Sequence, residues 1–259
     1  MNKQSPGIEA KNISKSWGDN ETLPVFENIN LNISPGEFVG IYGPNGSGKT
    51  TLLYVLSKLE QASKGTVNYI NSSKHESAFV FQDYKGSLYN WLKVFENIAF
   101  QKWFSEKEPK SSLVQDVKQL LSEYNLTALR PLLTKYPYDI SGGECQLVAL
   151  ARAFFAKPAL LFLDEPFSAL DVKNRKLLLA ALQQMWSTHK PTVLLVSHEI
   201  DDVLLTAQRV LAVGDNPMKI IGEWSLPWSL PRAQSLIVTD EFAKIQQEIK
   251  SKVYLGDKK

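Results

Sequence analysis

The chain has 259 residues, with 29 Lys and Arg against 27 Asp and Glu, and its formal net charge of +2 gives no argument for a nucleic acid or an anionic membrane surface as partner. The single cysteine, Cys145, excludes an internal disulfide, and no apolar stretch approaches the ~20 residues of a membrane span. Residues 1–7 lack the apolar segment of a secretory signal, so we expect a soluble chain of one large domain, or a core with a subdomain.

The N-terminal segment shows the alternation that is typical of a half-buried sheet. Between residues 8 and 33, apolar side chains recur among polar neighbours, with a break at Gly18, Asp19 and Asn20. This pattern predicts short antiparallel strands with one buried face. Further strands are predicted over residues 37–42, 65–70 and 78–81.

The middle of the chain has a helical pattern. Apolar residues with helical spacing predict helices over residues 94–104 and 113–124. Strong helix formers predict a third helix over residues 144–156, which ends before Pro158.

Strands and helices alternate after residue 158. The predicted strands are 160–163, 192–196 and 210–213, and the predicted helices are 172–187 and 199–207. Such alternation implies right-handed crossovers and a mostly parallel sheet. The remaining residues are less regular, because prolines keep the first half extended or turned, and one amphipathic helix is predicted over residues 240–253.

A glycine-rich stretch between a predicted strand and a predicted helix fits the spacing G-x-x-x-x-G-K-[ST] of a phosphate-binding loop. Its glycines let several backbone N–H groups point toward one place, where the helix N-terminus adds partial positive charge. Lys49 is placed to reach the terminal phosphates of a nucleoside triphosphate, and the Thr50 hydroxyl to hold a magnesium ion. An ordinary Gly-rich turn is the alternative, which the complete motif in its strand–loop–helix context disfavours. The predicted loop consists of Gly43, Pro44, Asn45, Gly46, Ser47, Gly48, Lys49 and Thr50.

Two acids follow the predicted strand 160–163. Asp164 ends this buried strand, a position that suits a magnesium partner for the phosphate loop. Glu165 comes next and could polarise an attacking water. Acids commonly end strands, so this pattern gains its weight from its pairing with the phosphate loop.

A second glycine-rich helix start lies at Ser141, Gly142 and Gly143. Ser141 is a suitable N-cap, and two glycines at a helix start form an anion-binding nest. A capped helix with a flexible entry is an equally open interpretation.

Two further features belong near the acid pair. Residues 168–171 predict a turn and an N-cap, and His198 ends a predicted strand. A lone histidine there is usually structural, but this strand end should lie at the same sheet edge as Asp164, where parallel sheets bind ligands.

Together these motifs resemble the ATP-binding subunit of an ABC transporter. Residues 43–50 are similar to its Walker A loop and residues 160–164 to its Walker B strand. Residues 141–143 resemble its signature motif and residues 168–171 its D-loop. Gln82 and His198 stand at the positions of its Q-loop and switch histidine. The resemblance extends roughly from residue 8 to residue 213.

The resemblance implies an α/β fold, namely a RecA-like P-loop NTPase core with a parallel sheet, an N-terminal antiparallel β subdomain and a helical subdomain. We therefore predict one ABC ATPase domain over residues 1–259. Residues 1–87 and 156–214 would form the nucleotide-binding core with its β subdomain, residues 88–155 the helical subdomain, and residues 215–259 a C-terminal extension.

The resemblance also implies roles for individual residues. The catalytic residues would be Glu165, His198, Lys49 and Gln82, and the Mg²⁺ ligands Thr50, Gln82 and Asp164. Trp17 stands where a tyrosine or phenylalanine commonly stacks on adenine; an indole can do this too, and core packing is the alternative. The residues expected to contact ATP are Trp17, Gly43, Pro44, Asn45, Gly46, Ser47, Gly48, Lys49, Thr50, Thr51, Ser141, Gly142 and Gly143.

The implied partners are a second ATPase subunit, in a homodimer or pseudo-dimer, and integral membrane permease subunits. A periplasmic or extracellular solute-binding protein would act indirectly, no nucleic acid is expected, and the chain would lie in the cytoplasm, peripheral on the inner face of the membrane. The permease would dock on the helical region, with Tyr84, Leu88, Trp91 and Phe95 as candidate lining; an ordinary core role for these residues is equally open.

A narrower resemblance concerns residues 80–98 and 230–242, which look like importer subunits of the nitrate, sulfonate and taurine group. It implies ATP-driven import of a small anion. The alternative is a soluble ABC ATPase of an assembly system such as iron–sulfur cluster biogenesis. The sequence departs from the family at Asn90, where the subgroup usually has proline, and at Cys145 and Leu147, which replace residues that are often polar or basic.

Overall fold

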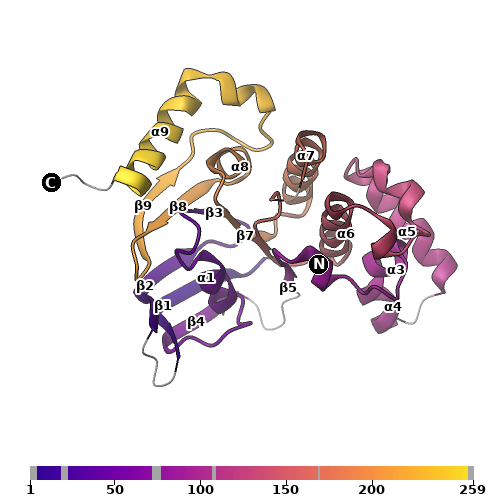
Figure 1. Cartoon of the computed structure of the whole chain (residues 1–259), viewed down its shortest axis with the longest axis horizontal. Helices are drawn as coiled ribbons and strands as arrows, with labels where there is room; N and C mark the ends of the chain where they lie inside the picture. The colour runs from indigo at the N-terminus through magenta and orange to yellow at the C-terminus, as the bar shows by residue number, and fades with distance from the viewer. Residues whose placement is uncertain (1–4, 19–22, 72–76, 107–108, 169, 256–259) are drawn as a thin grey trace.

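A computed structural model describes residues 5–18, 23–71, 77–106, 109–168 and 170–255. Figure 1 shows the smaller sheet at the lower left of the molecule and the larger sheet beside it, with most helices above the sheets and to their right. The predicted break at residues 18–20 falls partly, at Asp19 and Asn20, outside the described residues. No helix of the described part is long and apolar enough to cross a membrane.

The smaller sheet is the predicted antiparallel one. Its strand order is β2-β1-β4, and Ile8 pairs with Ile33 across β1 and β2. Ile8, Ala10 and Ile13 form its buried side, as the apolar pattern predicted, and an irregularity in the pairing between Ala10 and Ile13 shifts the alternation there. The strands are β1 (Gly7–Trp17), β2 (Leu23–Ile33) and β4 (Lys64–Ile70).

The larger sheet has the order β5-β6-β7-β3-β8-β9. Neighbouring strands are parallel except β9, which runs antiparallel to β8. The parallel sheet is confirmed, whereas β9 is a strand that the sequence did not predict, and it lies beyond the predicted core boundary at residue 214. The strands are β3 (Phe38–Tyr42), β5 (Ser77–Val80), β6 (Leu160–Asp164), β7 (Thr192–Ser197), β8 (Arg209–Gly214) and β9 (Lys219–Ser225).

Helices α1, α7, α8 and α9 lie against the larger sheet, and helices α3 to α6 gather on the side of the molecule away from α9 (Figure 1). The single helix predicted over 94–104 is instead two helices that meet at Ala99, whose φ of −87° and ψ of 6° interrupt the helix. The apolar spacing continues across this break, so periodicity could not reveal it. The α-helices are α1 (Lys49–Leu56), α2 (Tyr84–Ser87), α3 (Val94–Ile98), α4 (Phe100–Glu106), α5 (Lys110–Glu123), α6 (Gly142–Phe155), α7 (Val172–His189), α8 (Ile200–Thr206) and α9 (Asp240–Leu255).

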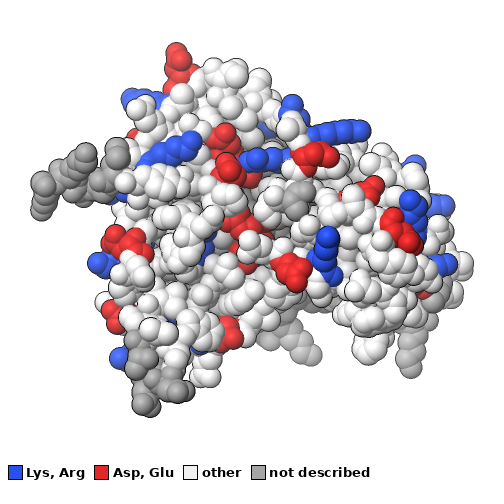
Figure 2. All heavy atoms as spheres, viewed as in Figure 1, with Lys and Arg blue, Asp and Glu red and all other residues white. Residues whose placement is uncertain are grey.

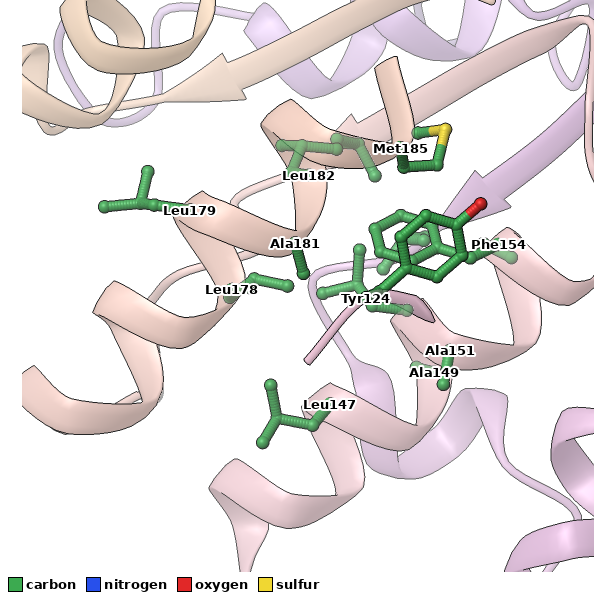
Figure 3. Close-up of a cluster of buried hydrophobic side chains, with 14 of the residues drawn as sticks. Tyr124, Leu147, Ala149, Ala151, Phe154, Leu178, Leu179, Ala181, Leu182 and Met185 are labelled. Carbon is green, nitrogen blue, oxygen red and sulfur yellow. The ribbon is translucent and has the colours of Figure 1, made fainter. Parts of the chain in front are cut away.

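A continuous core joins the helical end to the sheet. Figure 3 shows side chains of α6 and α7 that point toward one another, with Tyr124 beside Phe154. Tyr124 is fully buried, and its hydroxyl lies 2.8 Å from Nε2 of His189 at the end of α7. Short 3₁₀ segments complete the chain at Thr127–Leu132, Pro137–Asp139 and Gln234–Val238.

The C-terminal segment packs back onto the larger sheet through α9, whose Phe242 and Ile249 are buried. The buried guanidinium of Arg232 donates to the carbonyls of Leu204 and Ala207, so it caps the end of α8. Burial lowers the pKa of Arg232 to about 10. On the face shown in Figure 2, charged side chains of both signs are interspersed.

Candidate functional site

The predicted phosphate-binding loop joins β3 to α1. Gly46 and Gly48 have positive φ values of 76° and 101°, which L side chains rarely adopt. A Cβ on Gly48 would also lie 2.6 Å from the Val25 side chain of β2. Both glycines are therefore required by the backbone, and the loop is held directly against the smaller sheet.

Lys49 is folded back into this loop. Its ammonium donates to the carbonyl oxygens of Gly43 at 3.0 Å and Pro44 at 2.7 Å, and the residue is 5% exposed. Burial lowers its pKa, although Glu165 and Asp164 act in the opposite direction. The loop thus positions a buried cation beside two acids, an arrangement that suits a polyanionic ligand. Ser47 contributes a buried hydroxyl without a hydrogen-bond partner among the described residues.

The first acid lies next to the loop, as predicted. The Thr50 hydroxyl donates to Oδ1 of Asp164 at 3.0 Å, and Asp164 is fully buried. Burial raises the pKa of Asp164 to about 6, against the effects of Thr50 and Lys49. Its Oδ2 has no hydrogen-bond partner among the described residues.

These oxygens fit the hard-cation chemistry of Mg²⁺. A hydroxyl and a carboxylate that are already adjacent are typical ligands of that ion, and the second carboxylate oxygen remains available for it. Gln82 lines the same cavity as Thr50 and Asp164. The volume of this cavity is about 730 Å³. The three predicted metal ligands therefore converge on one cavity.

The second acid is paired with the histidine. His198 Nδ1 lies 2.8 Å from Oε2 of Glu165, and Glu165 is 6% exposed. Glu165 has a φ of 48°, and its backbone N–H donates to the carbonyl of Val196 at 3.0 Å. The parallel order β6-β7-β3 brings the ends of three strands to one edge, so both predicted strand-end groups meet there.

Sequence reasoning missed Gln146, which supports this acid from α6. Its amide nitrogen donates to the carbonyl oxygens of Glu165 and Pro166, and the residue is 2% exposed. A glutamine in a helix interior carries no signal of its own, because only the tertiary packing buries it. Cys145 and Leu147 on either side are also buried, so the two departures from the family pattern are core positions.

The signature segment has different surroundings. Ser141 caps α6, as predicted, in a reciprocal arrangement with Glu144: the Glu144 N–H donates to Ser141 Oγ at 3.3 Å, and the Ser141 N–H donates to Glu144 Oε2 at 2.7 Å. Ser141 is exposed, and residues 141–143 do not line the cavity of Thr50 and Asp164. This segment therefore does not form part of the cavity at which the predicted Mg²⁺ ligands meet.

The turn after the acids is tied to them. Ser168 Oγ donates to the carbonyl of Glu165 at 3.0 Å, and Asp171 is the N-cap of α7, accepting from the Asn174 N–H at 2.8 Å. The N-cap prediction is confirmed, while Ala169 of the same predicted turn lies outside the described residues.

Trp17 lies at the end of β1 and is 42% exposed, so core packing does not explain it. It pairs with Leu23 at the start of β2, two residues before the Val25 side chain that contacts Gly48. Trp17 is therefore at the end of the smaller sheet where β2 approaches the loop. Thr51 lies in the first turn of α1 and is half-buried.

The four residues expected to line a docking groove divide into two kinds. Leu88 and Phe95 are core residues, 4% and 8% exposed, because they face the interior of the helical region. Trp91 is 74% exposed, and Tyr84 is half-buried. The cavity beside Gln82 is lined instead by Tyr89, Phe100 and Arg152, which the sequence did not single out.

This fold and this arrangement of loop, acids and histidine define a P-loop nucleoside-triphosphate-binding protein. Residues 26–168 match the family model described as "ABC transporter". The chain is 33% identical over 246 residues to the aliphatic sulfonates import ATP-binding protein of Bacillus cereus, a match that covers 93% of this chain and 91% of the relative.

Other relatives are longer than this chain. The sulfate/thiosulfate import ATP-binding protein of Pectobacterium atrosepticum is 37% identical over 225 residues, which cover 83% of this chain and 66% of the relative. The matched part of this chain thus spans slightly less than two thirds of that relative.

A solved structure titled as a dimeric post-hydrolysis state of the ATP-binding cassette MJ0796, bound to ADP and Pi, has a TM-score of 0.74 and 26% identity, and the match covers 86% of this chain and all of that one. This chain belongs to the ABC transporter family.

Proposed function

We propose that this chain hydrolyses ATP to power the import of a small anion of the sulfate or sulfonate type through a membrane permease. The observation that carries the ATPase part is the joint placement of Lys49, the Thr50–Asp164 contact and the Glu165–His198 pair at one sheet edge. The anion class rests on relatives that are named for sulfate/thiosulfate and aliphatic sulfonates import. Nitrate and taurine, which the narrower resemblance names beside sulfonate as examples of the anion, remain predictions.

The site residues have two kinds of role: some bind ATP and Mg²⁺, and others position the attacking water. Lys49 exchanges its contacts with the Gly43 and Pro44 carbonyls for the β- and γ-phosphates, and the loop N–H groups and the α1 N-terminus hold the same oxygens. Thr50, Asp164 and Gln82 hold Mg²⁺, which supplies charge neutralisation on the phosphates. Trp17 stacks on the adenine.

Glu165 orients and polarises the attacking water, and His198 fixes the carboxylate of Glu165. Gln146 holds the backbone of residues 165 and 166, which keeps this acid in place. Most of the acceleration then comes from positioning and from electrostatic stabilisation of the transferred phosphoryl group.

A second copy or a similar subunit completes the site. The exposed Ser141 and the half-buried Gly142 and Gly143 form a helix start, which suits the γ-phosphate held by a partner subunit. The solved dimeric cassette to which this chain is similar supports this assembly. The permease docks beside Tyr89 and Phe100, the helical-region side chains that line the same cavity as Thr50 and Asp164, and the exposed Trp91 lies beside Tyr89, with ring centroids 5.5 Å apart. The chain then lies on the inner face of the membrane, and a solute-binding protein on the other side acts through the permease.

The test is to purify the tagged chain from its native cells in mild detergent and to identify its partners by mass spectrometry. A stoichiometric multi-span membrane protein is expected, and the ATPase rate of that complex should rise with sulfate or an aliphatic sulfonate, presented with its binding protein. Recovery with soluble partners alone would refute the transport role. Recovery of the permease with no response to these anions would refute only the substrate class.

A further inference from the structure

Lys15 is a buried cation two residues before Trp17 in β1. It is 8% exposed, which is rare for a lysine unless its ammonium group is paired. The ammonium donates to Glu60 Oε2 at 3.1 Å and to the carbonyl of Gln61 at 3.0 Å. It also lies 4.1 Å from the centroid of the Trp17 ring.

This geometry fixes the indole from one side. Residues i and i+2 of a strand point to the same face of the sheet, so Lys15 and Trp17 are neighbours by the strand period. The π-face of an indole carries negative charge that attracts a cation at this distance. Because Glu60 and Gln61 hold the ammonium from the segment before β4, the ring is tied to a second element and still remains 42% exposed.

We propose that Lys15 is a positioning residue for the adenine base, which holds the Trp17 ring so that the base stacks on the ring face opposite the ammonium. This inference rests on the proposed stacking of ATP on Trp17. A ring that is already fixed loses less rotamer freedom when the base binds, so the affinity for ATP is higher than with a free ring. Lys15 does not touch the phosphates and acts only through Trp17.

The experiment compares a ligand with the base and one without it. Affinities of the full chain for ATP and for inorganic tripolyphosphate are measured by isothermal titration calorimetry. The variants are Lys15→Met, Trp17→Ala and the double variant. Lys11→Met is the matched control, because Lys11 lies in the same strand but its side chain is 61% exposed and pairs with Glu9.

We expect Lys15→Met to weaken ATP binding about threefold to tenfold, which is the range of a partly desolvated cation–π contact. Trp17→Ala should weaken it by at least as much, and the double variant should match Trp17→Ala. Tripolyphosphate affinity should stay the same in every variant, which also shows that the loop is folded. Lys11→Met should leave both affinities unchanged.

The failures are distinguishable. If Trp17→Ala leaves ATP affinity unchanged, the stacking is refuted and the role of Lys15 with it. If Trp17→Ala weakens ATP binding but Lys15→Met does not, only the role of Lys15 is refuted. An effect of Lys15→Met that persists in the Trp17→Ala background, or that appears equally with tripolyphosphate, would show that Lys15 acts through the fold and not through the ring.

Discussion

The chain has two glycine-rich helix starts with similar local chemistry and different surroundings. The loop before α1 is packed against Val25 and Val213, and its lysine and threonine are joined to Asp164 and to backbone carbonyls of the same chain. The segment before α6 is exposed, and the hydrogen bonds described for Ser141 are those to Glu144 and that from the Cys145 N–H to its carbonyl.

This difference shows that the N-terminus of a helix forms a functional site only when suitable side chains surround it. The first start has a buried cation, two acids and a histidine at one sheet edge, which are the groups that the proposed hydrolysis uses. The second has its backbone dipole and the Ser141 hydroxyl, with the Tyr84 hydroxyl and the Lys85 side chain next to Gly142, so its chemistry suits recognition of an anion. A chain with one complete and one incomplete start is suited to pairing with a second subunit, which is the arrangement proposed above.

The largest effect is expected at Glu165, the proposed catalytic acid beside the loop before α1. Glu165→Gln should lower the ATP hydrolysis rate by about 10²- to 10⁴-fold, because the amide cannot polarise the water. ATP affinity should be preserved, since Lys49 and the loop are unchanged. Phosphate release and ATP binding by the purified chain measure the two quantities.

Glu199→Gln is the matched control, because Glu199 is 53% exposed and lies 3.7 Å from the other nitrogen of His198. It should keep most of the activity. An unchanged hydrolysis rate in Glu165→Gln would remove Glu165 from the proposed mechanism.

A smaller effect is expected at the ion pair that joins the helices behind the complete site. Arg175, in the first turn of α7, donates to Oδ1 of Asp202 on α8 at 2.8 Å, and the Asp202 side chain is 2% exposed. Helix α7 follows the turn at residues 168–171, and helix α8 follows His198. Arg175→Met leaves the buried carboxylate without its cation, which should lower the free energy of unfolding by about 3 kcal/mol at pH 7.5.

The pKa of Asp202 determines how the destabilisation caused by Arg175→Met changes with pH. Burial raises the pKa of Asp202 to about 6, above its unfolded value, and loss of Arg175 raises it further. The native state then binds a proton more readily than the unfolded state, so the destabilisation is greatest above the folded pKa and is relieved as the pH falls toward 5. Urea unfolding at both pH values measures it, with the exposed Lys176→Met as control. Equal destabilisation at pH 5 and 7.5 would contradict the ionic role of the pair.

The complete site could be predicted because its signals are local. The spacing of residues 43–50 and the acids after a buried strand are each visible in a short window, and parallel topology then places the strand ends at one edge. His198 could be placed beside Asp164 by the same argument before any distance was known.

The rest depends on tertiary partners. Strand β9 exists because it pairs with β8, and its short sequence after Pro217 has no pattern that distinguishes it from an extended loop. Apolar type alone could not separate the buried Phe95 from the exposed Trp91, since Phe95 packs inward from α3 whereas Trp91 lies in the turn before that helix. Gln146 was missed for the same reason.

The smallest effect on stability is expected at the second start, where it separates the two roles of Ser141. Ser141→Ala removes an N-cap and should lower the free energy of unfolding by about 1 kcal/mol. Thr239→Ala removes the Thr239 hydroxyl that accepts from the Phe242 N–H at 3.3 Å at the start of α9, and it should cost a similar amount. If Ser141 serves a partner's nucleotide, only Ser141→Ala should reduce ATP hydrolysis, while ATP binding by the separate chain stays the same in both variants. Equal hydrolysis in the two variants would make Ser141 a helix cap alone, and the second subunit would then have to complete the site without it.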